Sequence, residues 1–163
     1  MENISRKNIR LKNFDYSKSG AYFITMCIHN RVHLFGEIIK GELFPKENSP
    51  HKMVENHLHK VSVKFSGAFI SKYVIMPDHI HFLIIINSCN YQLCDIIKWF
   101  KIVTTNDYIR GVKKGLYLAF KKYFWQRNYY EHIIRNEYDY LEKYRYIVNN
   151  PKKWEQEWGI PFE

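Results

Sequence analysis

The sequence predicts an α+β sandwich in which one antiparallel sheet carries helices packed on one face. Runs rich in β-branched and aromatic residues alternate with stretches that repeat apolar residues at helical spacing, and no internal repeat or low-complexity linker interrupts them. The chain has 163 residues, of which 46% are hydrophobic, enough for a substantial core. We therefore expect a single domain that covers residues 1–163.

Four regions are expected to contribute strands: residues 20–29, a hairpin over residues 32–44, an antiparallel pair from residues 68–76 and 79–87, and residues 120–134 with the approaches to a last strand. The first hairpin is indicated by Gly36 and Gly41 between apolar pairs. In the antiparallel pair, Pro77 and Asp78 favour the turn because proline breaks helices and aspartate suits turns.

Three regions are expected to be helical: residues 45–64, 91–108 and 136–150. In the second region Leu93, Ile96 and Phe100 recur at three- and four-residue intervals, which predicts a face turned to the core. The third region should stop at Pro151, because proline disfavours helix in the residue before it. Lys152 and Lys153 would then form a solvated tail.

The charge of the chain favours nucleic acid as a partner. Twenty-five Lys and Arg residues against sixteen Asp and Glu residues leave a net charge of +9, the balance expected of a protein that meets polyanions. A basic surface with no dedicated ligand is the alternative. Three cysteines without a C-x-x-C pair suit a reducing cytoplasm, and the lack of a long apolar run predicts neither export nor a membrane span.

His79 and His81 form an H-x-H pair within a predicted strand. Strand geometry puts both imidazoles on one face and turns Ile80 into the core. Paired neutral imidazoles suit a divalent metal, and the third ligand sets the preference among metals. Two solvated strand histidines are the alternative, but burying two titratable rings without a purpose would be costly. Asp78 either orients an imidazole or ends the turn.

The last predicted helix is crowded with tyrosines, at positions 138, 140, 144 and 146. For any one of them, packing into a core or an interface is the default interpretation. Tyr146 differs from the others because Asn150 follows it by four residues, which makes the two neighbours on one helix face. A hydroxyl is thereby paired with an amide oxygen that can complete a metal shell.

Three blocks of sequence resemble one known family. The strand YVIMPDHIHFLIII resembles the M-P-N/D-H-x-H strand of the single-tyrosine HUH transposases. The segment FWQRNYYEHIIRNEYDYLEKYRYIVNNPKKW resembles the tail of the REP-associated tyrosine transposases, and FDYSKSGAYFITMCIHNRVHLFG resembles the N-terminal strand of that branch. The blocks occur in the order found in the family and extend from about Phe14 to Trp154.

The resemblance implies a ferredoxin-like sheet with the H-x-H strand at its centre. It implies that His79 and His81 hold Mg²⁺ or Mn²⁺, that Tyr146 is the nucleophile, and that Asn150 occupies the position of the third metal-coordinating side chain. That position is usually Gln in the insertion-sequence branch, and Asn matches the REP-associated branch. The implied activity is cleavage and rejoining of single-stranded or hairpin DNA through a 5′-phosphotyrosine, by a monomer or homodimer in the cytoplasm.

Four residues around the last predicted strand are candidates for DNA contact: Trp125, Arg127, His132 and Arg135. The two arginines suit phosphate clamps, and His132 is the weaker candidate. Trp125 offers a stacking surface for unpaired bases, together with Tyr129 and Tyr130. Strand packing with solvated basic ends is the alternative interpretation.

Two other functions remain open. A relaxase or replication-initiator nickase shares the histidines and the tyrosine, but such enzymes usually belong to larger chains. A DNA-binding module that keeps the fold without activity would act as a hairpin-binding regulator. Nicking of labelled single-stranded hairpin DNA in the presence of metal separates these possibilities.

Overall fold

The computed structural model describes residues 20–87 and 90–158, so the start of the Phe14 block lies outside the described residues. Its main sheet has the strand order β4-β5-β1-β6, and every neighbouring pair is antiparallel. The strands are β1 (Gly20–Cys27), β4 (Ala68–Ile75), β5 (His79–Ile86) and β6 (Tyr130–Ile134). This order is ferredoxin-like, and the predicted α+β class with a mainly antiparallel sheet and helices packed on it is confirmed.

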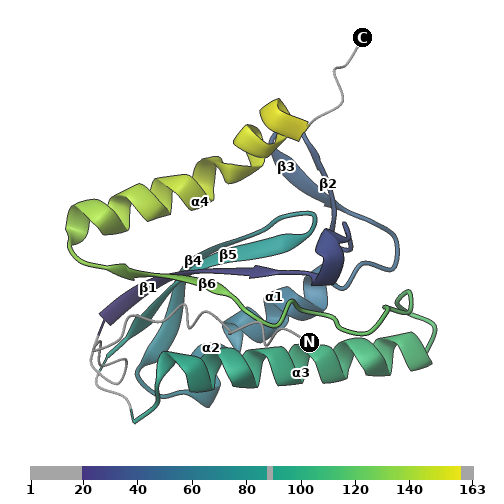
Figure 1. Ribbon diagram of the computed structural model, residues 1–163, viewed down its shortest axis with the longest axis horizontal. Coiled ribbons are helices and arrows are strands. Elements are labelled where there is room, and N and C mark those ends of the chain that lie inside the picture. Colours follow the sequence, from purple (N-terminus) through teal and green to yellow (C-terminus); the bar gives the residue numbers. More distant parts are fainter. Residues whose placement is uncertain (1–19, 88–89, 159–163) are drawn as a thin grey trace, which may run out of the picture.

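Three helices cover one face of this sheet (Figure 1): α1 (His51–His59), α2 (Val61–Lys64) and α3 (Leu93–Lys113). Alternate residues of β1, such as Tyr22, Ile24 and Met26, are fully buried against them. Because side chains of a strand alternate between its two faces, the residues between them point to the other side of the sheet. The main core therefore lies between the sheet and α1–α3.

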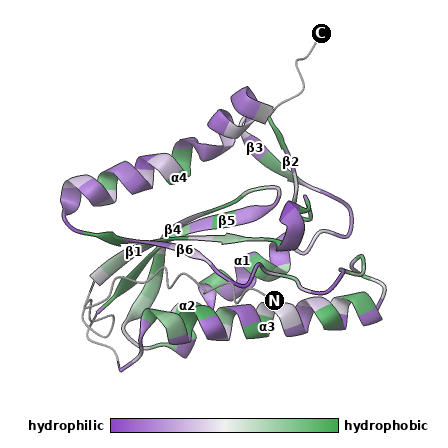
Figure 2. Cartoon of the chain, viewed as in Figure 1, coloured by the Kyte–Doolittle hydropathy of each residue, from purple (hydrophilic) through white to green (hydrophobic). Residues whose placement is uncertain are grey.

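The opposite face of the sheet is crossed by α4 (Glu137–Trp158), as Figure 1 shows. Here Ile147 is fully buried against Phe23 and Leu83, with Tyr140 and Tyr144 packed around them. The helix is mostly hydrophilic (Figure 2) and turns only this narrow apolar stripe to the sheet. Helices thus lie on both faces, whereas the sequence pattern was interpreted as helices on one face only.

A small second sheet stands against the C-terminal end of α4. It consists of β2 (Gly36–Ile39) and β3 (Glu42–Pro45), the expected hairpin. Glycine is required at Gly36, where φ is +151° and a Cβ would lie 2.2 Å from the Phe44 carbonyl oxygen. The Lys40 amide at the turn donates to Glu155 Oε1 at 2.7 Å, which ties the hairpin to the helix.

The hairpin explains why α4 does not stop at Pro151, as the sequence predicted. Proline removes one backbone hydrogen bond, a loss that outside contacts can offset. Pro151 is itself buried, and beyond it Glu155 bonds the hairpin while Trp154 packs against His33 with ring centroids 5.8 Å apart. Tertiary contacts therefore hold the last two turns in helical form.

Two other expected elements differ in extent. The predicted helix over residues 45–64 breaks into α1 and α2 at Lys60, and α3 continues five residues beyond the predicted end at Tyr108. Residues 120–129 do not form a strand, apart from an isolated bridge between Ile28 and Trp125. The strand-like aromatic residues of this segment instead pack on α3.

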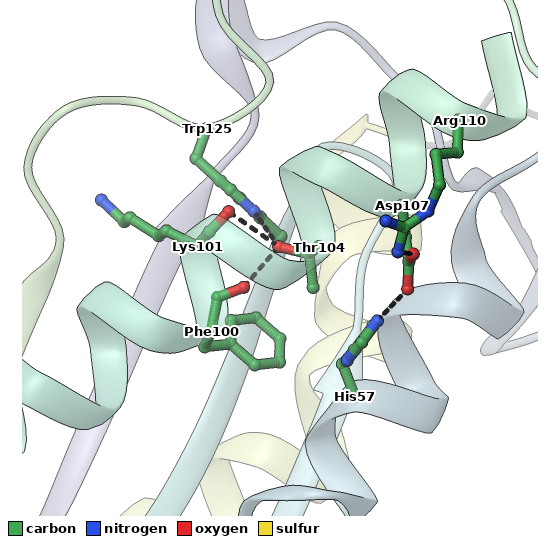
Figure 3. A network of polar contacts seen from close by, with 7 residues as sticks. All are labelled: His57, Phe100, Lys101, Thr104, Asp107, Arg110 and Trp125. Atoms are coloured by element: carbon green, nitrogen blue, oxygen red, sulfur yellow. Dashed lines mark hydrogen bonds and ion pairs between the residues drawn. The ribbon is translucent and has the colours of Figure 1, made fainter. Parts of the chain in front are cut away.

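Polar contacts fix α3 to its neighbours (Figure 3). The indole Nε1–H of Trp125 donates to Thr104 Oγ1 at 2.8 Å, and the Thr104 hydroxyl in turn donates to the Phe100 carbonyl at 2.7 Å. On another side of the helix, buried His57 of α1 forms a hydrogen bond with the Asp107 carboxylate. Arg110 forms an ion pair with the other oxygen of the same carboxylate. In the described ranges, no helix is both long and apolar enough to cross a membrane.

Candidate active site

The two histidines lie together on the face of the sheet that α4 covers. His79 pairs with Cys27 across the strands and His81 pairs with Thr25. Both side chains are buried, and their Nε2 atoms are 3.0 Å apart. Ile80 between them is fully buried in the main core, as the period of a strand requires.

The Nδ1 atom of each imidazole, opposite the close Nε2 pair, makes a hydrogen bond that holds the ring. His79 Nδ1 lies 2.5 Å from Asp78 Oδ1, and His81 Nδ1 lies 2.8 Å from Thr25 Oγ1. The Asp78 carboxylate accepts a hydrogen bond from His79 Nδ1–H, which leaves His79 Nε2 available to a ligand, and the Thr25 hydroxyl holds the orientation of the His81 ring. Burial, followed by the nearby His79 and Arg31, lowers the pKa of His81 to about 2, so its ring is neutral.

Asp78 joins this pair to Arg31. Its second carboxylate oxygen lies 3.2 Å from Arg31 Nε, and Arg31 Nη1 donates to Cys27 Sγ at 2.9 Å. Arg31 and the preceding Asn30 have φ of 56° and 57°, in the left-handed region that residues other than glycine seldom adopt. Such backbone strain persists where the surroundings enforce it, and it often occurs at functional sites.

Three side chains of α4 face the histidines at intervals of four residues. The Tyr146 ring lies edge-on to His81 with ring centroids 5.2 Å apart, and the Trp154 ring is tilted against His79 at 5.6 Å. Asn150 between them is 7% exposed. Together with Arg31 and Thr25 they line a cavity of about 260 Å³, which Cys27, Lys153 and Glu157 also border.

The other tyrosines of α4 are placed elsewhere. Tyr140 donates from its hydroxyl to Ser71 Oγ at 3.1 Å, and the ring of Tyr144 lies under Lys72 Nζ at 5.3 Å. Tyr138 is 75% exposed near the start of the helix. Tyr146 alone among these four tyrosines lines the cavity of the histidine pair, as its spacing from Asn150 suggested.

The IS200-like transposase family matches residues 17–150 of this sequence, a span that contains both histidines, Tyr146 and Asn150. The chain belongs to this family. The family prediction made from the sequence is thereby confirmed.

Similar proteins occur in Haemophilus influenzae and Escherichia coli. A Haemophilus influenzae protein without a characterised function is 37% identical over 93% of this chain and 91% of its own length. The REP-associated tyrosine transposase of Escherichia coli K12 is 25% identical over 85% of this chain and 70% of its own. The solved structure of a REP-associated tyrosine transposase bound to a REP hairpin shares the fold, with a TM-score of 0.62 and 21% identity over 93% of this chain and 76% of that one.

The residues of the cavity fit a divalent cation. Two nitrogen ligands about 2.1 Å from one octahedral ion and at right angles to each other would lie about 3 Å apart, close to the 3.0 Å between the two Nε2 atoms. Within residues 20–87 and 90–158, no third His, Cys, Asp or Glu completes a metal cluster. Asn150 lines the same cavity and carries an amide oxygen, a ligand type that Mg²⁺ and Mn²⁺ accept.

The four candidate DNA contacts do not gather at this cavity. Trp125 is 5% exposed and belongs to the main core, so its ring offers no face for stacking. His132 Nε2 is held by both oxygens of Asp139, at 2.8 and 2.9 Å. Arg135 directly follows β6. The last residue of β6, Ile134, pairs with Ala21 at the start of β1, whereas the histidines pair with the end of β1, so Arg135 lies remote from the cavity. Arg127 is exposed on the segment that precedes β6.

Of the two further stacking candidates, only Tyr130 is well exposed near the histidines. It pairs with Thr25 and is 53% exposed, with its ring edge-on to Phe23 at 6.4 Å. Tyr129 instead packs on the main core, with Lys101 Nζ 5.5 Å from its ring centroid.

The cavity also contains residues that were not assigned to a site from the sequence, among them Thr25, Arg31, Lys153 and Trp154. A local signal exists for the last two, since positions 146, 150, 153 and 154 follow helical spacing, but the predicted stop at Pro151 removed them from the helix. Lys153 thus lies within α4 and not in a tail: it borders the cavity, but its side chain is still 62% exposed, with Nζ 3.7 Å from Glu157 Oε1. Thr25 reaches the cavity through the register of β1 against β5, and Arg31 reaches it through a loop with positive φ. No short sequence motif reveals either feature.

Proposed function

We propose that this chain is a metal-dependent single-stranded DNA transposase that cleaves and rejoins DNA through a 5′-phosphotyrosine formed on Tyr146. The observation that carries the proposal is the shared cavity: His79 and His81 of the sheet face Tyr146 and Asn150 of α4 across about 260 Å³. A phenol, two available imidazole nitrogens and an amide oxygen are the groups that a metal-assisted tyrosine transesterification needs.

In the cleavage step, the Tyr146 oxygen attacks a DNA phosphorus in line and the bond from phosphorus to the 3′ oxygen breaks. The phenol proton is released to solvent, and the departing 3′ oxygen takes up a proton to become a free hydroxyl. The number of phosphoester bonds is unchanged. A 3′-hydroxyl can therefore attack the phosphotyrosine in the reverse direction, which rejoins DNA and frees the tyrosine.

The chain's own residues would orient this reaction. His79, His81 and Asn150 would hold Mg²⁺ or Mn²⁺, which when bound neutralises charge on the phosphoryl oxygens. Tyr146 is 41% exposed and lines the cavity, while its ring is packed against His81 and Phe23. Packing of this kind limits the positions of the ring and favours attack from one direction.

Arg31 is the strongest candidate for binding the scissile phosphate. Its guanidinium has five N–H donors, of which the contacts with Asp78 and Cys27 engage only part. Arg31 borders the cavity and its side chain is 52% exposed, so its remaining donors would be free to make a strong charge-assisted bond to phosphate. Lys153 borders the same cavity from α4 and supplies a second cation.

Hairpin DNA is the favoured substrate. The similarity to a REP-associated tyrosine transposase that binds a REP hairpin supports this choice. The four proposed catalytic groups lie at one cavity within a single chain, which is compatible with cleavage by a monomer or by a homodimer. The cytoplasm is the compartment in which this protein would meet such DNA.

The test is a nicking assay on end-labelled single-stranded hairpin DNA, with Mg²⁺, with Mn²⁺ and with chelator. We expect cleavage only with metal, together with a protein–DNA adduct that survives denaturing electrophoresis and maps to Tyr146 by peptide mass spectrometry. Hairpin binding without any adduct would instead identify a DNA-binding regulator, and an adduct on another tyrosine would refute the assignment of the nucleophile.

A further inference from the structure

A second groove lies between the C-terminal half of α3 and the segment that leads back from α3 to β6. This segment runs alongside α3 (Figure 1), and the groove between them has a volume of about 280 Å³. Ile109 of α3 and the aromatic rings of Phe120 and Phe124 form an apolar floor. Neither His79, His81 nor Tyr146 borders this groove, so it is separate from the catalytic cavity.

The rim of the groove is cationic and aromatic. Lys122 and Arg127 border it, whereas none of the described lining residues is acidic. Tyr123 is 55% exposed, and Lys122 Nζ lies 5.6 Å from its ring centroid. Lys122 has φ of 72°, so this exposed cation sits in the left-handed region that residues other than glycine seldom adopt.

The groove adjoins the catalytic cavity. Gln126 of the groove donates its backbone N–H to the carbonyl of Cys27 at 2.8 Å, and Cys27 borders the catalytic cavity. Lys101 fixes the same segment, because its Nζ donates to the carbonyls of Gln126 and Arg127 at 2.9 and 3.0 Å. Cys27 and Gln126 therefore connect the two sites, and the groove begins next to the residues that border the catalytic cavity.

We infer that this groove binds the unpaired nucleotides next to the scissile phosphate, with a base over Tyr123 and the apolar floor and with phosphates on Lys122 and Arg127. The inference rests on the proposed function for the presence of cleavable DNA. Single-stranded nucleic acid is favoured as occupant because the groove combines a ring and apolar floor for bases with cations for the backbone. Its position next to the catalytic cavity supports the same occupant.

The substitution Lys122→Gly tests this site with little risk to folding. Glycine adopts positive φ readily, so the change removes the cation while relieving the backbone. Lys40→Gly is a matched control, because Lys40 also has positive φ, of 52°, and lies in the β2–β3 turn away from the groove. Tyr123→Ala removes the exposed ring.

Binding is measured by fluorescence anisotropy on three labelled hairpins: one with no single-stranded flank, one with a 5′ flank and one with a 3′ flank. We expect Lys122→Gly and Tyr123→Ala each to weaken binding of one flanked hairpin roughly tenfold, as the loss of a stacked base or its cation implies. Affinity for the unflanked hairpin and the cleavage rate at saturating DNA should stay as in the wild type. Lys40→Gly should leave all three affinities unchanged.

Two results would overturn the inference: no loss of affinity for either flanked hairpin, or an equal loss on all three hairpins, which would indicate general electrostatic attraction. These binding experiments do not need cleavage. Failure of the wild-type protein to nick DNA would therefore count against the proposed function, while the three-hairpin comparison still decides whether the groove binds a flank.

Discussion

The ring of Tyr146 lies edge-on to that of His81, with ring centroids 5.2 Å apart. The contact brings together a residue of α4 and a residue of the central strand β5 that are 65 positions apart in the sequence. It places a phenol at the edge of a pair of imidazoles whose Nε2 atoms are 3.0 Å apart.

The first prediction concerns this phenol. Tyr146→Phe deletes one hydroxyl from a half-exposed ring and keeps its packing on His81 and Phe23. We expect the covalent adduct with hairpin DNA to disappear while the melting temperature and DNA affinity stay near wild type. Tyr144→Phe is the control and should form the adduct. An adduct that persists in Tyr146→Phe, or is lost in Tyr144→Phe, means that another tyrosine is the nucleophile.

The second prediction concerns the two histidines. His79→Ala and His81→Ala should each abolish metal-dependent cleavage and leave hairpin binding largely intact, because phosphate contacts from Lys and Arg supply most of the affinity. His59→Ala, on the opposite helical layer beside Tyr73, serves as the control. Cleavage and anisotropy are measured on the same DNA. Undiminished cleavage by both variants would exclude the metal assignment.

Much of this site follows from the sequence because its determinants are local. The period of a strand places His79 and His81 on one face, and the period of a helix places Tyr146 next to Asn150. Both rules depend only on neighbouring residues. The pairing of β4 with β5 also follows, since both apolar runs are long enough to pair and the turn at Pro77 favours an antiparallel partner.

The remaining features depend on contacts that are distant in the sequence. α4 continues past Pro151 because Glu155 meets the β2–β3 hairpin, more than 100 residues earlier. Trp125 looked like a stacking surface because aromatic residues in a basic segment suit single-stranded DNA, yet its indole is buried and bonds Thr104. Composition cannot distinguish a ring on the surface from one in the core.

A third prediction distinguishes Lys153 from its neighbour Lys152. Lys153 borders the catalytic cavity, whereas the Lys152 side chain packs against Gly41 of the hairpin. If Lys153 contacts phosphate, Lys153→Ala should weaken DNA binding and make the slope of log K against log salt less negative by about 0.7 to 0.9. Lys152→Ala should leave this slope unchanged. Identical slopes for the two variants would show that Lys153 makes no phosphate contact that Lys152 lacks.

The fourth prediction concerns stability rather than DNA. Thr104→Val removes the buried hydroxyl that accepts the Trp125 N–H (Figure 3) and leaves that donor unsatisfied. We expect the free energy of unfolding in urea to fall by about 1 to 3 kcal/mol. The adjacent Thr105 is only half-buried, and Thr105→Val should change it by no more than about 0.5 kcal/mol. An equal effect at both positions would mean that the indole bond contributes nothing specific.

The final prediction concerns Asp78, whose carboxylate joins His79 to Arg31. One oxygen lies 2.5 Å from His79 Nδ1 and the other 3.2 Å from Arg31 Nε, with 4% of the Asp78 side chain exposed. A buried carboxylate in this position orients the imidazole and increases its basicity, and loss of such a partner typically weakens metal affinity by about 10- to 100-fold. Asp78→Ala should therefore raise the Mg²⁺ or Mn²⁺ concentration needed for half-maximal cleavage by that factor.

Asp78→Asn separates the two roles of the carboxylate. Its amide oxygen can still accept from His79 Nδ1–H, but it no longer carries the charge that holds Arg31. We expect a smaller shift of the metal requirement than in Asp78→Ala, together with weaker DNA binding, because the guanidinium loses its anchor beside the cavity. Cleavage rates over a metal titration and anisotropy without metal measure the two effects independently. A metal requirement that is unchanged in Asp78→Ala would show that Asp78 serves only the turn between β4 and β5.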